Sequence, residues 1–414
     1  MSERRYPVHL AGKHYTPEFQ TDPARAKLWK RVLERNYGQH GRCLCPGKGE
    51  RKLAIKRRED SDTLHLARFA GTGPEHANEC RYYAPAPERS GLQGYTQQAV
   101  EETDDGLRVK LARGLRVKTA AEEGSAESGQ ENSAGNRKAA VTLLGLLHLL
   151  WTEGRLNVWY PGMAGKRNPG VVNSALRNAA DRISANRMPL SDVLMLAAGK
   201  DSRDEARNRA RVLDAQAKGR RLLVVAPLAR FDQDKHGQLS RLPLAGPFGM
   251  PSLWLTREAN ERMARRFARE MSCWKAGDRV IAIAQLNPRP NQGAWEVAEV
   301  ALMPVTERWI PVDSGHEAVI EARLAEEGRS FDKPLRFDAD EEVVFPDFWL
   351  LDVGNAYPLE VFGMATEEYL LRKQRKIEQY HREYGVDGWW SWDAASDPAR
   401  ARIPAFPAPV QRRS

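Results

Sequence analysis

One polar stretch limits how this chain can fold more than any other feature: TAAEEGSAESGQENSAGNRKA, residues 119–139. It is rich in Gly, Ser and Glu and contains no aromatic or large aliphatic residue. Because it cannot bury enough apolar surface to offset the entropy lost on ordering, it predicts a flexible linker. A chain of 414 residues is also too long for one hydrophobic core. We therefore expect a multi-domain protein.

The pattern of apolar residues divides the chain further and predicts a mixed α/β protein. Three apolar runs in 140–220 have the length of short helices, the last of them LSDVLMLAAG at 190–199. They suggest either a generic helical unit or a helix-turn-helix-like module. The expected parts are a small N-terminal module (1–118), the linker (119–139), a helical segment (140–220), a strand-rich segment (221–310), a C-terminal domain (311–395) and a Pro/Arg tail (396–414).

The charge of the chain indicates its partners. The formal net charge is +9 and the sequence pI is about 9.4, which favours an acidic partner such as nucleic acid, DNA in particular. The N-terminus is charged and is not followed by an apolar run. The longest apolar stretch, Ala140 to Trp151, is shorter than the ~20 residues of a membrane span. We therefore expect a cytoplasmic protein that does not enter a membrane.

Three of the four cysteines cluster with a histidine. Cys43 and Cys45 form a C-x-C pair, and His76 and Cys80 follow with the spacing of one helical turn. Three thiolates and one imidazole complete a tetrahedral Zn²⁺ site with no open position, so the zinc would be structural. The alternative is a set of unligated thiols beside a turn histidine. A cytosolic context favours metal binding over disulfides.

Two carboxylates near the C-terminus suggest chemistry on a phosphodiester. An apolar strand is expected to end at Pro346-Asp347, and the next strand carries Glu360. If the two strands form a hairpin, both acids can hold one Mg²⁺ ion, which prefers oxygen ligands. Lys376 lies on a following helix, on the same face as Tyr369, Lys373 and Tyr380. From that face its amine could orient water and stabilise developing negative charge.

This arrangement resembles the PD-(D/E)XK nucleases, which have a restriction-endonuclease-like fold. Residues 311–395 carry the order helix, three strands, helix, strand, with Pro346-Asp347-Phe348 as the PD motif and Glu360 as the second acid. Phe362 occupies the usual lysine position, and the resemblance to branches with a migrated lysine implies that Lys376 takes its role. The resemblance also implies a role near the metal for Glu317 in Ser314-x-x-Glu317, although this pair also fits a capping box.

A second resemblance covers most of the chain. Cys43-x-Cys45, the ARFAGTGPEH-x-x-x-C segment, LLGLLHLLW and FPDFWLLD are together similar to an uncharacterised family of proteobacterial plasmid and integrative-element proteins, a domain of unknown function. We therefore expect a Mg²⁺-dependent nucleic-acid phosphodiesterase associated with mobile DNA. Two alternatives stay open: a catalytically inactive nucleic-acid-binding protein on the same fold, and a non-enzymatic adaptor of a mobile element.

Overall fold

The computed structural model describes residues 4–57, 63–86, 91–96, 98–103, 106–117, 139–288, 294–337, 345–354 and 357–410. The linker predicted at 119–139 lies outside these ranges, apart from its last residue. Within them the chain forms ten α-helices and four β-sheets, which confirms a mixed α/β protein. None of the described helices combines the length and apolarity needed to cross a membrane.

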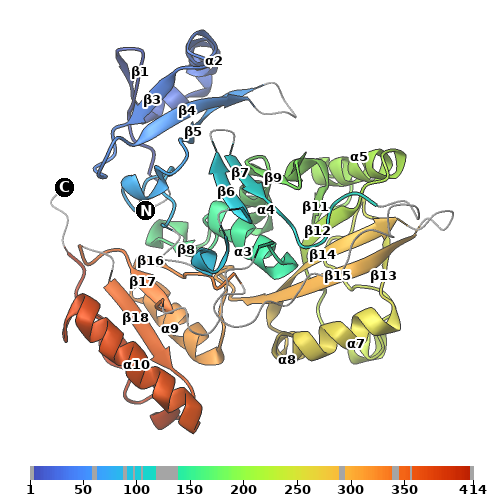
Figure 1. Cartoon of the computed structure of the whole chain (residues 1–414), viewed down its shortest axis with the longest axis vertical. Coiled ribbons are helices and arrows are strands. Elements are labelled where there is room, and N and C mark those ends of the chain that lie inside the picture. Colours follow the sequence, from blue (N-terminus) through green and yellow to red (C-terminus); the bar gives the residue numbers. More distant parts are fainter. Residues whose placement is uncertain are drawn as a thin grey trace.

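The first sheet is antiparallel throughout and forms an N-terminal module with two short helices, drawn in blue in Figure 1. The helices are α1 (Pro17–Thr21) and α2 (Ala26–Arg35). The strands, in spatial order, are β2 (Lys13–Tyr15), β1 (Val8–Leu10), β3 (His40–Cys43), β4 (Lys52–Arg57) and β5 (Leu64–Arg68). Val8, Leu33 and Leu53 are completely or almost completely buried in a small core of this module, which also contains Cys43 and Cys80.

The central part contains two sheets that share one core. The smaller sheet has the order β10 (Met188–Pro189), β9 (Ile183–Ala185), β7 (Gly106–Val109), β6 (Val100–Thr103). The larger sheet has the order β11 (Leu194–Leu196), β12 (Leu222–Pro227), β14 (Arg279–Pro288), β15 (Ala294–Val305), β13 (Ser252–Trp254). The helices of this part are α3 (Leu143–Glu153), α4 (Pro169–Ala180), α5 (Arg203–Ala217), α6 (Gln233–His236), α7 (Arg257–Arg266) and α8 (Ala268–Ala276).

Helix α3 shows how sequence and burial agree in the central part. The Thr142 side chain caps its N-terminus by accepting a hydrogen bond from the Gly145 amide. Its residues are apolar on nearly every side, and most are buried. A helix that is apolar all round belongs inside a core, so α3 lies at the centre of this part. Its C-terminal end, at Glu153, contributes to one wall of a cavity described below.

One predicted helix of the central part is wrong. The run at 190–199 forms a short 3-10 turn (Leu190–Asp192) followed by strand β11, which pairs in parallel with β12. A short continuous apolar run fits a buried strand as well as a helix, and here the neighbouring strand decided between them. Of the three predicted helices, the first two form as α3 and α4, and the third helix of 140–220 is α5, which follows the misassigned run.

The last sheet has the order β19 (Trp390–Asp393), β18 (Tyr357–Phe362), β17 (Phe348–Leu350), β16 (Phe331–Asp332), β8 (Val158–Trp159). The pairs β8–β16, β16–β17 and β17–β18 are antiparallel, and β19 is parallel to β18. Helix α9 (Gly315–Glu326) precedes β16, and α10 (Glu367–Tyr384) connects β18 to β19. Figure 1 shows this part at the lower left, in orange and red.

Two details of this sheet differ from the prediction. The run KPLRF at 333–337 is the first of the three strands predicted after the helix, but the observed strand β16 ends at Asp332, before Pro334, which has no amide hydrogen for a ladder. Asp347, expected to close a strand, lies directly before β17 instead.

Strand pairing also crosses the predicted segment boundaries. β7 and β9 pair although the predicted linker separates them in the sequence. β8, from the segment predicted as helical, completes the edge of the C-terminal sheet. The central and C-terminal parts are therefore joined through a shared sheet.

Candidate metal centre and acidic site

The four predicted metal ligands converge in the N-terminal module. Cys43 ends β3 and Cys45 follows it, while His76 comes directly after a 3-10 turn (Gly73–Glu75) and Cys80 lies four residues later. All four side chains are buried, and their possible ligand atoms lie within 4.8 Å of one another. Three cysteines and one histidine could therefore hold a metal ion such as zinc.

The spacing of these atoms fits a tetrahedron. The Sγ atoms of Cys43 and Cys80 are 3.7 Å apart, and His76 Nδ1 lies 3.6 Å from the Sγ atoms of both Cys45 and Cys80. Metal bonds of about 2.3 Å to sulfur and about 2.1 Å to nitrogen give edges of about 3.8 and about 3.6 Å. The sulfur atoms are also much too far apart for a disulfide, whose bond is about 2.05 Å. The donor set and its dimensions both fit Zn²⁺.

Backbone contacts hold this centre in place. The Ala77 amide donates to Cys45 Sγ over 3.4 Å, and Arg51 Nη1 donates to the carbonyl oxygens of Cys45 and Gly47. A Cβ atom at Gly47 would lie 2.1 Å from the Glu75 carbonyl oxygen, so only glycine lets the two ligand loops approach each other. Hydrogen bonds with the Cys43 and then the Cys80 thiol lower the pKa of Cys45, which favours a thiolate at that position.

The second site forms where β17 and β18 pair. Phe348 lies opposite Leu359 in this antiparallel register, so Asp347 lies opposite Glu360. Leu359 and Val361 share a core with Ile320 and Leu324 of α9. Since successive strand residues point to opposite faces, Glu360 faces away from α9, toward α10. Asp347 and Glu360 are only 4% and 3% exposed. Two buried like charges opposite each other are unfavourable unless other groups compensate them.

Helix α10 supplies much of that compensation at Glu360. Lys376 Nζ lies 2.6 Å from Glu360 Oε1, and the Tyr380 hydroxyl donates to Oε2 over 2.9 Å. Asp347, before β17, accepts a hydrogen bond from the Val361 amide of β18 at its Oδ2 over 2.8 Å. Lys373, one turn before Lys376, lies over the Phe362 ring and pairs with Asp393 on β19 at 2.7 Å. Of these two lysines, Lys376 is the one that the structure brings to the acids.

The environment of Glu360 changes its acidity. Burial, followed by the nearby charge of Asp347, raises the pKa of Glu360 to about 7, although Lys376 opposes the shift. A carboxyl group with such a pKa exchanges protons near neutral pH, a property that is common at functional sites. Tyr369 is also near this site: its hydroxyl accepts a hydrogen bond from the Gly363 amide, and burial raises its pKa to about 12.

Glu317 lies at the N-terminus of α9 and belongs to the same group of charges. Its amide donates to the Ser314 hydroxyl, and its Oε2 accepts from the Asp313 amide over 2.9 Å. The Ser314 cap therefore forms. The reciprocal hydrogen bond to the Glu317 carboxylate comes from the Asp313 amide, one residue before Ser314. Burial raises the pKa of Glu317 to about 7, with further contributions from the charges of Asp313 and Asp347 and opposition from Lys333.

Three charged residues of this site were not predicted. Lys333 is 1% exposed, and its Nζ lies 3.0 Å from Glu317 Oε2 and 3.1 Å from Asp313 Oδ2. Arg336 Nη2 lies 3.9 Å from Asp347 Oδ1. The sequence does not indicate that a single lysine or arginine in a strand-like run is buried. Only the Pro334 that follows Lys333 hinted that the run was not a regular strand.

The acidic site and the cysteine centre differ as metal sites. Among the described residues, only the Cys/His group brings three or more possible ligand atoms within 4.8 Å of one another. At the acidic site, Lys376 and Lys333 each neutralise one buried glutamate. The donor chemistry of Asp347, Glu360 and Glu317 suits Mg²⁺, and their side chains would have to gather more closely to share an ion.

Comparison with known proteins gives the family of the chain. A family model described as a protein of unknown function, DUF1173, matches residues 17–395. Searches of curated proteins and of solved structures found no match. The match begins before the cysteine centre and ends after β19, and so includes both sites. The chain therefore belongs to the DUF1173 family of proteins of unknown function.

Proposed function

We propose that this protein is a metal-dependent nucleic-acid phosphodiesterase that acts on DNA, and that its active site lies at Asp347 and Glu360. The observation that carries the proposal is the pair of buried carboxylates opposite each other, Asp347 directly before β17 and Glu360 on β18, with Lys376 paired to Glu360. Burying like charges side by side costs stability, so such a pair is expected where function requires it.

The arrangement of the C-terminal part supports a restriction-endonuclease-like domain. Helix α9 is followed by three antiparallel strands, then α10, then a strand parallel to β18. This is the order expected of a PD-(D/E)XK nuclease. The Lys376 contact supports a migrated lysine, because Phe362 fills the usual lysine position and lies under the Lys373 amine.

Each residue would have a distinct role. Asp347 and Glu360, with Glu317 nearby, would hold Mg²⁺, which supplies an activated water and neutralises charge on the phosphodiester. The Lys376 amine would leave Glu360 to hold the attacking water and stabilise negative charge. Tyr380 would keep its hydrogen bond to Glu360 and orient the carboxylate. Lys333 would restrain Glu317 in the same way.

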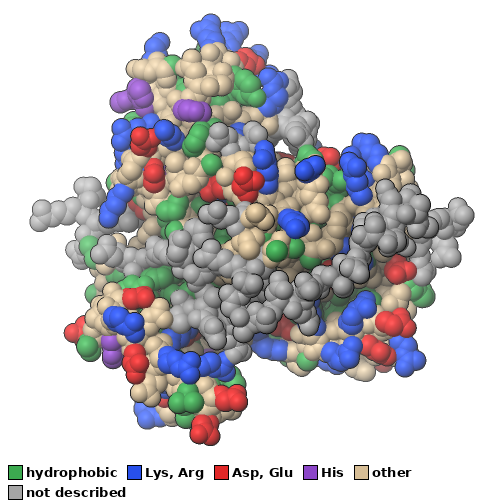
Figure 2. All heavy atoms as spheres, in the orientation of Figure 1, with side chains coloured by type: hydrophobic (Ala, Val, Ile, Leu, Met, Phe, Trp, Pro, Cys, Tyr) green, Lys and Arg blue, Asp and Glu red, His purple; other side chains and the backbone are tan. Residues whose placement is uncertain are grey.

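The distribution of charge supports nucleic acid as the partner. Residues 4–57 contain fourteen Lys and Arg but only four Asp and Glu. Figure 2 shows Lys and Arg side chains around this upper part of the molecule. Basic surfaces bind phosphate backbones without regard to sequence. Zn²⁺ in the cysteine centre would hold this module together. The resemblance to plasmid and integrative-element proteins supports a cytoplasmic role with mobile DNA.

A cleavage assay tests the proposal. Purified protein with Mg²⁺ is expected to nick plasmid or cut single-stranded DNA, and D347A to lose the activity by at least ~100-fold. D393N is the matched control, because Asp393 is a carboxylate on the neighbouring strand that pairs with Lys373. Equal cleavage by wild type and D347A would overturn the assignment.

A nucleic-acid-binding protein without catalysis is the second candidate, favoured by the lysines that already neutralise both glutamates. Mg²⁺ titration separates the two functions. An enzyme should bind Mg²⁺ in a manner that E360Q abolishes, whereas an inactive relative should retain DNA binding and show no Mg²⁺ affinity that depends on Glu360.

A further inference from the structure

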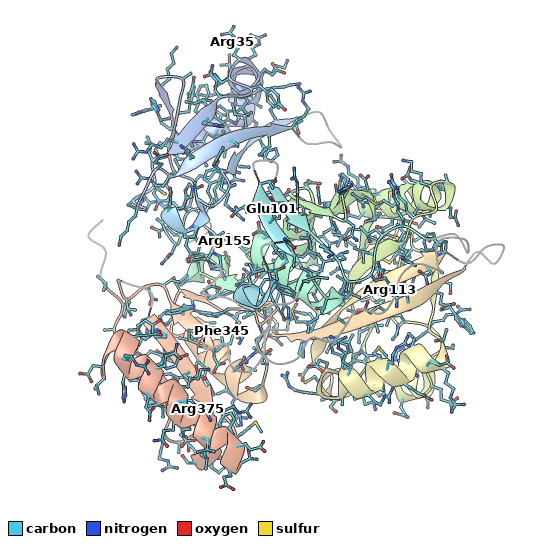
Figure 3. All side chains as sticks on the ribbon, viewed as in Figure 1. Arg35, Glu101, Arg113, Arg155, Phe345 and Arg375 are labelled. Atoms are coloured by element: carbon cyan, nitrogen blue, oxygen red, sulfur yellow. The ribbon has the colours of Figure 1, made fainter. Side chains whose placement is uncertain are left out.

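A cavity of about 470 Å³ lies between the N-terminal module and the central part. One wall comes from β5 and residues 81–83, and the other from the end of α3, the loop at 162–167 and α4. Figure 3 labels Arg155 where these two parts meet. The volume falls in the range of small-molecule sites, about 300–1,000 Å³, and is far too small for a nucleic-acid duplex.

The lining of this cavity is strongly basic. Six basic residues contribute to it, against the two acids Glu153 and Asp181. Glu153 already pairs with Arg68 at 2.8 Å and with Arg182 at 3.4 Å. A hollow with positive walls of low dielectric attracts anions. The basic residues are Arg68, Arg81, Arg155, Lys166, Arg167 and Arg182.

Other contacts indicate what kind of anion fits. Five of the six basic residues are arginines, whose planar guanidinium matches phosphate oxygens in pairs. Thr152 lines the cavity, and its buried hydroxyl has no hydrogen-bond partner among the described residues. An unpartnered buried hydroxyl at the wall of a basic cavity is suited to a polar ligand. Leu66, Met163 and Val171 add an apolar side where a flat ring could lie.

We infer that this cavity is a binding site for a nucleotide phosphate, separate from the acidic site. The phosphates would contact chiefly Arg81, Lys166 and Thr152, because Arg68 and Arg182 already pair with Glu153 and because Arg155 and Arg167 already donate to carbonyl oxygens. The base would lie against the apolar side. The nucleotide could be free or could be the phosphorylated end of a strand, since both present the same group. Arg155 Nη2 also donates to the Asn78 carbonyl oxygen over 2.8 Å, between two zinc ligands, so a bound phosphate would touch a residue that joins the module to the central part.

Calorimetry on the zinc-loaded full chain tests this site with ATP, inorganic pyrophosphate and uncharged adenosine. ATP and pyrophosphate are expected to bind with a stoichiometry of one, more weakly at higher salt, and adenosine at least tenfold more weakly than ATP. R81A/K166A should weaken ATP binding at least tenfold. R262A/K275A removes two exposed cations of α7 and α8 and should leave it unchanged.

Two further variants distinguish a ligand contact in this cavity from a purely structural role of Thr152 and from ATP binding at the acidic site. T152V keeps the side-chain shape, so a ligand contact predicts several-fold weaker ATP binding with an unchanged melting temperature. D347A should bind ATP as the wild type does. A short strand that displaces ATP only when it carries a 5′-phosphate assigns the site to strand ends, and no displacement assigns it to free nucleotides. Absence of binding by both ATP and pyrophosphate, or equal ATP binding by R81A/K166A, would overturn the inference.

Discussion

At the scale of single residues, Lys376 and Lys373 differ sharply although they lie one turn apart on α10. The Lys376 amine contacts Glu360, and the Lys373 amine contacts Asp393 and the Phe362 ring. Both are mostly buried, with side chains 19% and 17% exposed. The two lysines therefore form a matched pair, in which chemistry and position on the helix are alike and only the partner differs.

This pair gives a direct test of the proposed catalytic lysine. K376M is expected to lower DNA cleavage by about 100- to 1,000-fold, as for loss of one group that stabilises charge in a transition state. K373M should keep cleavage within about tenfold of wild type, because Lys373 contacts protein groups and would not contact the substrate. Cleavage rates with Mg²⁺ in excess measure both. A larger loss in K373M than in K376M would contradict the assignment.

Glu153 gives a residue-scale prediction about pH. Burial alone would raise the pKa of Glu153, but the charges of Arg68 and Arg182 outweigh it and lower the pKa below its ordinary value of 4.5. A lowered carboxyl pKa stabilises the fold above the unfolded pKa, and this stabilisation is lost as the pH falls through the folded pKa. E153Q should therefore cost about 3 kcal/mol at pH ~7 and progressively less below pH ~4.5.

Urea unfolding of wild type and E153Q at several pH values measures this difference. E261Q is a suitable control, since Glu261 forms an exposed pair with Arg257 on α7 and should change stability by less than about 0.5 kcal/mol. A destabilisation by E153Q that stays constant or grows in acid would show that the ion pairs do not hold the carboxylate charged.

The acidic site could be predicted from the sequence only in part. The positions of Asp347 and Glu360 can be predicted from the lengths of the two apolar strands. The position of Lys376 can be predicted from its helical spacing relative to Tyr380. Lys333 could not be predicted, because its burial depends on α9 and β16 packing against residues far away in the chain, and its ion pair with Asp313 depends on the same packing. The cysteine centre was easier to predict, since its four residues are of two uncommon types, cysteine and histidine, whose spacing alone indicates metal binding.

At the scale of elements, helix α2 presents a continuous basic stripe. Lys27, Arg31 and Arg35 are spaced by four residues, are exposed, and form no ion pair with any acidic residue in the described ranges. Leu33, on the opposite side, is 1% exposed in the core of the module. Figure 3 labels Arg35 at the top of the module, at the outer end of this stripe. A helix held by one face can offer the other to a phosphate backbone.

Reversing this stripe tests whether α2 binds DNA. K27E/R31E/R35E should weaken DNA binding and reduce the slope of log K against log salt by about 2 to 3, since each lost phosphate contact removes about 0.9. R262E/R265E/K275E changes three exposed cations on α7 and α8 and should bind as the wild type does. Fluorescence anisotropy over a range of salt concentrations provides the slopes. An unchanged slope for the α2 variant would exclude this helix from the interface.

The elements also show where prediction from sequence fails. Strands β12, β14 and β15 have the apolar residues of buried strands and were expected where they form. Strand β8 has two residues, too few for any periodic pattern. Strand β11 has three residues inside an apolar run that looks helical, and only pairing with β12 makes it a strand. Both errors concern long-range pairing, which local sequence does not encode.

At the scale of the whole molecule, the C-terminal part is incomplete without the central part. β8 pairs with β16, and Trp159 of β8 belongs to the same core as Phe331 and Phe348. The Asn157 side chain donates to Asp332 Oδ1 over 2.7 Å and to the Lys333 carbonyl oxygen over 3.0 Å. An isolated fragment 311–410 would therefore expose an apolar sheet edge, which promotes aggregation.

This predicts the behaviour of truncated chains. Fragment 311–410 should be insoluble or should elute as large aggregates in size-exclusion chromatography. Fragment 91–410, which retains β6 to β15, should elute as a defined species with cooperative unfolding. A monodisperse, cooperatively unfolding 311–410 fragment would contradict the dependence on β8.

The six residues from Arg155 to Tyr160 connect three regions of the protein. Arg155 donates to the carbonyl oxygen of Cys80 in the candidate metal centre, Asn157 donates to the Lys333 carbonyl oxygen, and β8 extends the sheet that carries Glu360. Arg155 also lines the basic cavity. A displacement of any one region must therefore be accommodated within these six residues. The N-terminal module and the acidic site are therefore linked through this short segment, so a movement of the one is transmitted to the other.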